Sequence, residues 1–167
     1  MMLELKRLSP EAIPAALAKA ERYRLLNEPA AAESICLDIL AVQPDHQDAI
    51  VTMLLALTDQ FRDEGAGRSL ARARELVPRL RDEYARLYYG AIICERRARA
   101  YLANGATALA RDWLDEALRG FDRAQALRPP GNDDAILRWN ACVRALEGLP
   151  PPTDELEDAR ERAILSE

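Results

Sequence analysis

The sequence is poor in the residues from which strands and membrane spans are built. Only 5% of its 167 residues are aromatic, and valine, isoleucine and threonine are sparse. Apolar and polar residues nowhere keep up the alternation that a half-buried strand requires. No stretch approaches the roughly 18 consecutive apolar residues of a membrane span. Alanine, leucine, arginine and glutamate dominate instead and favour the helix. We therefore predict an all-α protein that does not enter a membrane.

Histidine and cysteine are also scarce, which argues against the common metal and nucleophile sites. The one histidine, His46, lies in a turn, where we expect it to be solvated. A zinc site needs three or four closely spaced ligands, and the cysteines are far apart in apolar segments. No glycine-rich phosphate loop with its lysine and preceding strand occurs. We predict no catalytic residue, no cofactor, no metal, and three reduced core cysteines: Cys36, Cys94 and Cys142.

The first residues lack the features of a secretion leader. Residues 1–14 carry early charges and prolines where a signal peptide needs an unbroken apolar run. We therefore expect a cytoplasmic protein. Arginine supplies 21 of the 23 basic residues, which we take to indicate a bacterial setting.

Negative charge exceeds positive charge overall, but the two are separated along the chain. The net charge of −5 argues against a nucleic-acid partner. Residues 62–99 hold ten arginines and six acids, a net of +4. Residues 148–167 hold six acids and two arginines, a net of −4. A basic middle and an acidic end are therefore available to attract each other.

Helix-start and helix-stop residues divide residues 1–148 into seven predicted helices. Pro78 predicts an early stop in the fourth of them. The fifth and sixth are about two turns longer than the rest, or about 30 Å each, so this pair should project beyond its neighbour. The predicted ranges are 10–26, 30–42, 47–62, 68–81, 82–103, 106–127 and 133–147.

Residues 149–167 form a second unit, in which three prolines lead into an acidic stretch. Prolines 150–152 predict a stiff linker. Beyond them, Leu156, Ala159 and Ile164 share one face of a predicted short helix. We expect this helix to cap the last helix pair. The alternative is that it occupies a binding groove and competes with a ligand.

Two stretches of the sequence carry a helix-hairpin motif. In residues 116–140, Ala117, Phe121 and Ala124 lie on one helical face before two prolines. Residues 13–46 repeat this pattern with Ala20, Tyr23, Ala32, Ile39 and Pro44.

This spacing resembles the tetratricopeptide (TPR) repeat, strongly in these two stretches and weakly at residues 63–81. The resemblance implies a right-handed superhelix of antiparallel hairpins. In such proteins the first helices of successive repeats line a concave groove that holds a peptide or a partner's helix.

The resemblance places several polar side chains at the expected groove. Guanidinium groups bind carboxylates through two parallel hydrogen bonds, so we expect an acidic peptide or helix as ligand. The alternative is that the arginines form a solvated face. We predict that the tryptophans and the Tyr88–Tyr89 pair belong to the core. The candidate groove residues are Arg24, Arg96, Arg99, Arg138, Asn140 and Arg144.

The sequence thus favours a non-catalytic scaffold or adaptor that binds a protein or peptide partner. Two alternatives remain. One is a small acidic TPR-type secretion chaperone, which has similar length and charge. The other is a structural or accessory subunit of an enzyme complex that forms a homodimer through the long hairpin. Both a monomer and a homodimer are compatible with the sequence.

Overall fold

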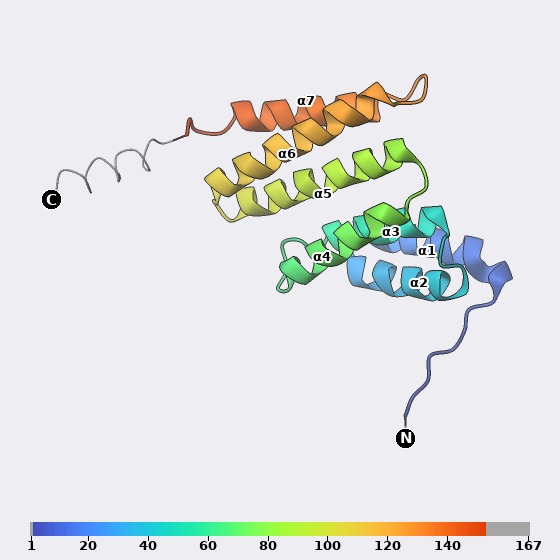
Figure 1. Ribbon diagram of the computed structural model, residues 1–167. Helices are drawn as coiled ribbons and strands as arrows, with labels where there is room; N and C mark the ends of the chain where they lie inside the picture. Colours follow the sequence, from blue (N-terminus) through green and yellow to red (C-terminus); the bar gives the residue numbers. More distant parts are fainter. Residues whose placement is uncertain (1, 153–167) are drawn as a thin grey trace.

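The computed structural model describes residues 2–152 and arranges them as seven α-helices packed in sequential antiparallel pairs (Figure 1). No strand occurs within this range, as the all-α prediction requires. The predicted helix beyond Pro152 lies outside the described residues. The helices are α1 (Ile13–Leu25), α2 (Pro29–Val42), α3 (Gln47–Thr58), α4 (Ala66–Leu76), α5 (Glu83–Ala103), α6 (Thr107–Ala126) and α7 (Asp134–Glu147).

Local side-chain chemistry explains several helix boundaries. Pro78 lies in the 3₁₀ turn Val77–Arg79 that ends α4, so the predicted early stop is confirmed. At the start of α3, His46 is more than a solvated turn residue, because its Nδ1 accepts a hydrogen bond from the amide of Ala49 at 3.2 Å. The Asn132 side chain accepts one from the amide of Asp134 at 3.0 Å at the start of α7.

The third helix ends earlier than the sequence predicts. It stops at Thr58 and not at Arg62. The Thr58 hydroxyl donates a hydrogen bond to the Leu55 carbonyl at 2.7 Å, and Phe61 is buried in the turn that follows. Asp59 keeps helical backbone angles, and its amide still donates to the Leu55 carbonyl at 3.0 Å. The residues after it form turns, so Arg62 leaves the helical path.

The core of the first four helices is built around α3. Ile50, Leu54 and Leu57 of this helix are fully buried, and α1, α2 and α4 pack around them. Ile93 and Ala100 of α5 belong to the same cluster. The fifth helix therefore connects the first four helices to the remainder.

The core of the last three helices depends on small residues and one aromatic ring. A Cβ added at Gly120 of α6 would lie 2.7 Å from the Cβ of Ala91 on α5. The two helices therefore approach closely at this point. Next to it, the buried Phe121 ring lies 5.8 Å from the Tyr88 ring. From α7, Ala135 and Cys142 complete the cluster.

The fifth and sixth helices have 21 and 20 residues, whereas the other helices have 11 to 14. This confirms the predicted long hairpin. Figure 1 shows the turn between α5 and α6 extending past the loop between α3 and α4.

Several predictions about the core need correction. Trp113, Tyr88 and Tyr89, predicted to be core residues, are only half-buried and pack against the buried cluster. Trp139, predicted to be buried, is 36% exposed, because α7 is the last described helix and no described element packs on its outer side.

Cys94 is only half-buried, unlike Cys36 and Cys142. Burial raises the pKa of both Cys36 and Cys142 to about 12, so these two thiols stay protonated at neutral pH.

Candidate binding pocket on the odd helices

The helices α1, α3, α5 and α7, which we call the odd helices, form a face with a pocket in it. The pocket has a volume of about 320 Å³ and draws residues from three distant parts of the chain. They come from the carboxyl end of α1, the turn after α3 and the second half of α5. The pocket is lined by Arg24, Leu25, Asn27, Thr58, Asp59, Phe61, Arg62, Arg96 and Arg99.

Asp59 holds two of the four lining arginines in place. Its Oδ2 accepts a hydrogen bond from Arg24 Nε at 2.8 Å, and its Oδ1 accepts one from Arg96 Nη1 at 3.3 Å. Because the Asp59 side chain is only 17% exposed, these ion pairs are less screened by water than surface pairs. A single carboxylate thus links α1 to α5 through the end of α3.

Positive charge exceeds negative charge inside the pocket. Four guanidinium groups and one carboxylate line it, which gives a net charge of +3. Arg62 is exposed and has no ion-pair partner among residues 2–152. We call the site formed by Arg24, Arg62, Arg96 and Arg99 the arginine pocket.

Arg96 is partly desolvated by its surroundings. Burial lowers its pKa below the usual value, and the nearby Asp59 offsets part of this effect. Burial disfavours a charged group unless an opposite charge lies close by. A second anion placed in the pocket would therefore stabilise the Arg96 guanidinium further.

A second ion-pair group continues the charged face toward α7. The Glu95 side chain is 1% exposed, and its Oε1 accepts hydrogen bonds from Arg99 Nη2 at 2.6 Å and from Arg138 Nη1 at 3.4 Å. Burial opposes the charged form of Arg138, but Glu95 and the Tyr88 hydroxyl together raise its pKa. Arg99 thus belongs both to this group and to the arginine pocket.

The backbone turn at Asn27 helps to form the pocket wall. Asn27 has a φ of 59°, a left-handed conformation that asparagine adopts more readily than most residues. The turn ends α1 directly after Arg24 and Leu25, and the Glu28 amide closes it by donating to the Tyr23 carbonyl at 2.8 Å.

Of the six candidates chosen from the sequence, three line the pocket and a fourth adjoins them. Arg24, Arg96 and Arg99 line the pocket, and Arg138 joins them through Glu95. Asn140 is half-buried and Arg144 is exposed on α7, and neither lines the pocket.

Sequence reasoning missed Asp59, Arg62 and Asn27. The sequence predicts both side chains of the first pair, Asp59 and Arg62, in the last turns of a longer third helix. The earlier end of α3 changes the position of Arg62, whereas Asp59 keeps helical backbone angles. The basic stretch that begins at Arg62 was the one signal that favoured this region.

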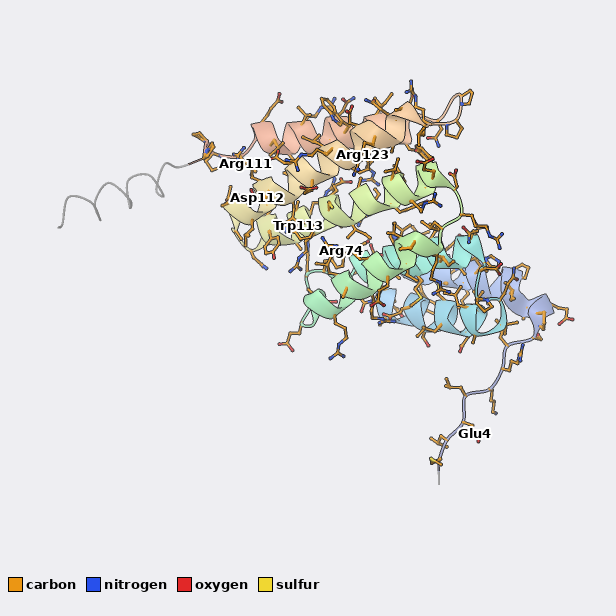
Figure 2. The ribbon with its side chains drawn as sticks, in the orientation of Figure 1. Glu4, Arg74, Arg111, Asp112, Trp113 and Arg123 are labelled. Carbon is orange, nitrogen blue, oxygen red and sulfur yellow. The ribbon has the colours of Figure 1, made fainter. Side chains whose placement is uncertain are left out.

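A second hollow, on the far side of α5, is less suited to a charged ligand. It has a volume of about 260 Å³ and lies between α4, α5 and α6. Arg74 stacks over the Trp113 ring at 5.0 Å (Figure 2), so its charge already has a partner. Asp112 and Glu116 also line this hollow, so its charged side chains sum to −1, compared with +3 for the first pocket.

Other classes of site receive no support from the described residues. Within residues 2–152, no three histidine, cysteine or acidic side chains are grouped to hold a metal ion. No described helix is both long and apolar enough to cross a membrane.

Comparison of the chain with protein-family models, with curated proteins and with solved structures finds no significant match. The TPR resemblance therefore stays a prediction.

Proposed function

We propose that the protein is a non-catalytic adaptor that binds an acidic segment of a partner protein in the arginine pocket. One observation carries the proposal: four guanidinium groups from three separate parts of the chain share a pocket with a single carboxylate. Arginine presents a planar, permanently charged group that matches carboxylates. A peptide with two or more acidic residues would supply the charges that the pocket lacks.

The helices that contribute to the pocket also support a repeat architecture. All of them are first members of the antiparallel pairs, and α7 continues their line through Arg138. In a right-handed TPR-like superhelix these helices line the concave side. We therefore propose this architecture for residues 1–148, with the arginine pocket as part of its groove.

The expected ligand also has apolar residues next to its acids. An exposed ion pair contributes only about 0–1 kcal/mol, whereas a micromolar complex needs about 8 kcal/mol. At the pocket wall, Leu25 is 88% exposed, and the neighbouring Leu26 is 61% exposed. Burial of these two side chains by a ligand would supply part of the difference.

Isothermal titration of the full chain with two synthetic peptides of equal length tests the proposal. One peptide alternates glutamate with leucine, and the other alternates lysine with leucine. We expect the acidic peptide to bind, with an affinity that falls as salt increases, and the basic peptide not to bind.

The variant Arg62→Glu reverses one pocket charge without breaking an ion pair between described residues. It should weaken binding of the acidic peptide about tenfold or more. Arg68→Glu is the matched control, because Arg68 is an exposed arginine of α4 outside the pocket. Equal binding of the two peptides, or equal loss in the two variants, would contradict the proposal.

A further inference from the structure

We infer that the chain's own residues 153–167, which we call the acidic segment, occupy the arginine pocket and compete with the partner. This inference rests on the proposed function and names how that site is regulated. Three observations carry it: the charge of the segment, the place where the described chain ends, and the apolar rim of the pocket.

The charges of the segment and the pocket are complementary. The acidic segment carries a net charge of −4, from six acids and two arginines. The residues lining the arginine pocket carry +3. Complementary charges both raise the rate of encounter and disfavour wrong partners. Of the described pockets, this one has the largest excess of positive charge.

The described chain ends at the same end of the helix stack as the pocket. Helices in sequential antiparallel pairs alternate in direction, so the carboxyl ends of the odd helices share one end of the stack (Figure 1). Arg24 lies in the last turn of α1 and Arg62 follows the end of α3. After α7, Leu149 packs on the core and the Pro150 carbonyl accepts a hydrogen bond from Arg111 at 2.7 Å.

The acidic segment is long enough to reach the pocket from Pro152. Fifteen residues extend at most about 50 Å, while neighbouring packed helices lie about 8–10 Å apart. The path from α7 past α5 to the end of α3 crosses two such spacings. A tethered segment has an effective concentration in the millimolar range, so even weak intrinsic binding keeps the pocket occupied.

The apolar residues of the segment match the rim of the pocket. Leu156 and Ile164 are interspersed with the acids, and Leu25 and Leu26 are the exposed leucines beside the arginines. This is the mixture of acidic and apolar residues that the energetic argument requires of any ligand. A partner must therefore displace the acidic segment before it binds.

The test measures the anisotropy of a fluorescein-labelled synthetic peptide with the sequence of residues 153–167. It compares the native full chain with a full-length neutral variant that carries D154N, E155Q, E157Q, D158N and E161Q. We expect the peptide to bind the neutral variant about tenfold or more tightly than the native chain, because the tethered competitor is gone. Adding Arg62→Glu to the neutral variant should weaken the binding about tenfold or more, and adding Arg68→Glu should not.

Three other outcomes of this experiment would contradict the inference. Equal affinity for the native and neutral chains would overturn the inference. So would binding that depends on Leu137 and Trp139 of α7 and not on Arg62, because the segment would then cover the last helix. A native dimer that the neutral variant lacks, seen by light scattering, would place the segment in a second copy and contradict binding within one chain.

A failure of the inference is distinguishable from a failure of the proposed function. If the neutral variant binds the glutamate–leucine peptide but not the peptide of residues 153–167, the inference fails and the proposed function stands. If the neutral variant binds neither acidic peptide, both fail.

Discussion

The four helices α1–α4 and the three helices α5–α7 bury their apolar residues in different ways. Around α3, medium-sized aliphatic side chains such as Ile50 and Leu54 fill the space between helices. Between α5 and α6, small residues let the backbones approach closely, and the large Phe121 ring is fully buried beside the aliphatic Ile92 and Leu114. Both regions bury aliphatic side chains, but only the second combines a fully buried aromatic ring with a close backbone approach at a glycine.

The seam between the two regions is partly polar. Ile93 and Ala100 of α5 pack against the first region, and beside them Asp59 joins Arg24 to Arg96 across the same boundary. A seam held by charged groups leaves arginines at the surface, where a ligand can meet them. The arginine pocket thus lies at the boundary between the two regions.

Among the substitutions that test this comparison, removal of the Phe121 ring should change the free energy of unfolding most. Truncation of a buried phenylalanine costs about 3–5 kcal/mol, so Phe121→Ala should lower the free energy of unfolding by that amount. Amide hydrogen exchange should accelerate in α6 and α7 more than in α2 and α3. Uniform acceleration across all helices would show that the two regions do not differ as described.

The glycine contact gives a matched pair of substitutions. Gly120→Ala should destabilise the protein by about 1–3 kcal/mol, because the new methyl group overlaps Ala91. Gly90→Ala on α5 meets nothing within 4 Å and should stabilise the helix by up to about 1 kcal/mol. Urea denaturation measures both, and a change of the same sign in the two variants would refute the close approach of α5 and α6.

Substitution of Asp59 tests whether partly buried ion pairs help to hold the two regions together. Asp59→Asn keeps the size of the side chain but removes the charge that Arg24 and Arg96 share, which should cost about 1.5 kcal/mol at this partly buried position. Thermal unfolding at low and high salt measures the loss. A loss that disappears at high salt would assign Asp59 to the solvated surface and not to the seam.

The two buried thiols, one in each region, should have the smallest effect on stability. Cys36 and Cys142 have pKa values raised to about 12 from 9.0, so they stay protonated in the folded state while they ionise in the unfolded state. Their stabilisation is complete below pH 9 and falls as the pH rises toward 12. Between pH 8 and 9.5 each thiol should lose on the order of 1 kcal/mol of stabilisation, and Cys36→Ala or Cys142→Ala should each remove its own share.

The sequence predicted the helices better than it predicted the pocket. Helix periodicity and the prolines at 78 and 129–130 were enough to place seven helices, and the length of α5 and α6 followed from the spacing between turns. Periodicity does not show where a buried side chain ends a helix early. Here the turns after Thr58, in which Phe61 is buried, take Arg62 off the helical path and to the pocket.

On α7, the sequence predicted binding residues that do not line the pocket. The resemblance to a repeat placed Asn140 and Arg144 at a groove, but the pocket draws only on α1, the turn after α3, and α5. Arg138 reaches the same charged face because the buried Glu95 attracts it, and a contact of this kind between distant residues has no signal in one sequence.

The most direct test of the arginine pocket follows the side-chain Nε–Hε resonances of the arginines while the full chain is titrated with the glutamate–leucine peptide. We predict the largest chemical-shift changes at Arg24, Arg62, Arg96 and Arg99, with little change at Arg119, which is exposed on α6 and paired with Glu116. Saturating binding of the peptide with shifts of equal size at Arg119, or with none at the pocket arginines, would contradict the account.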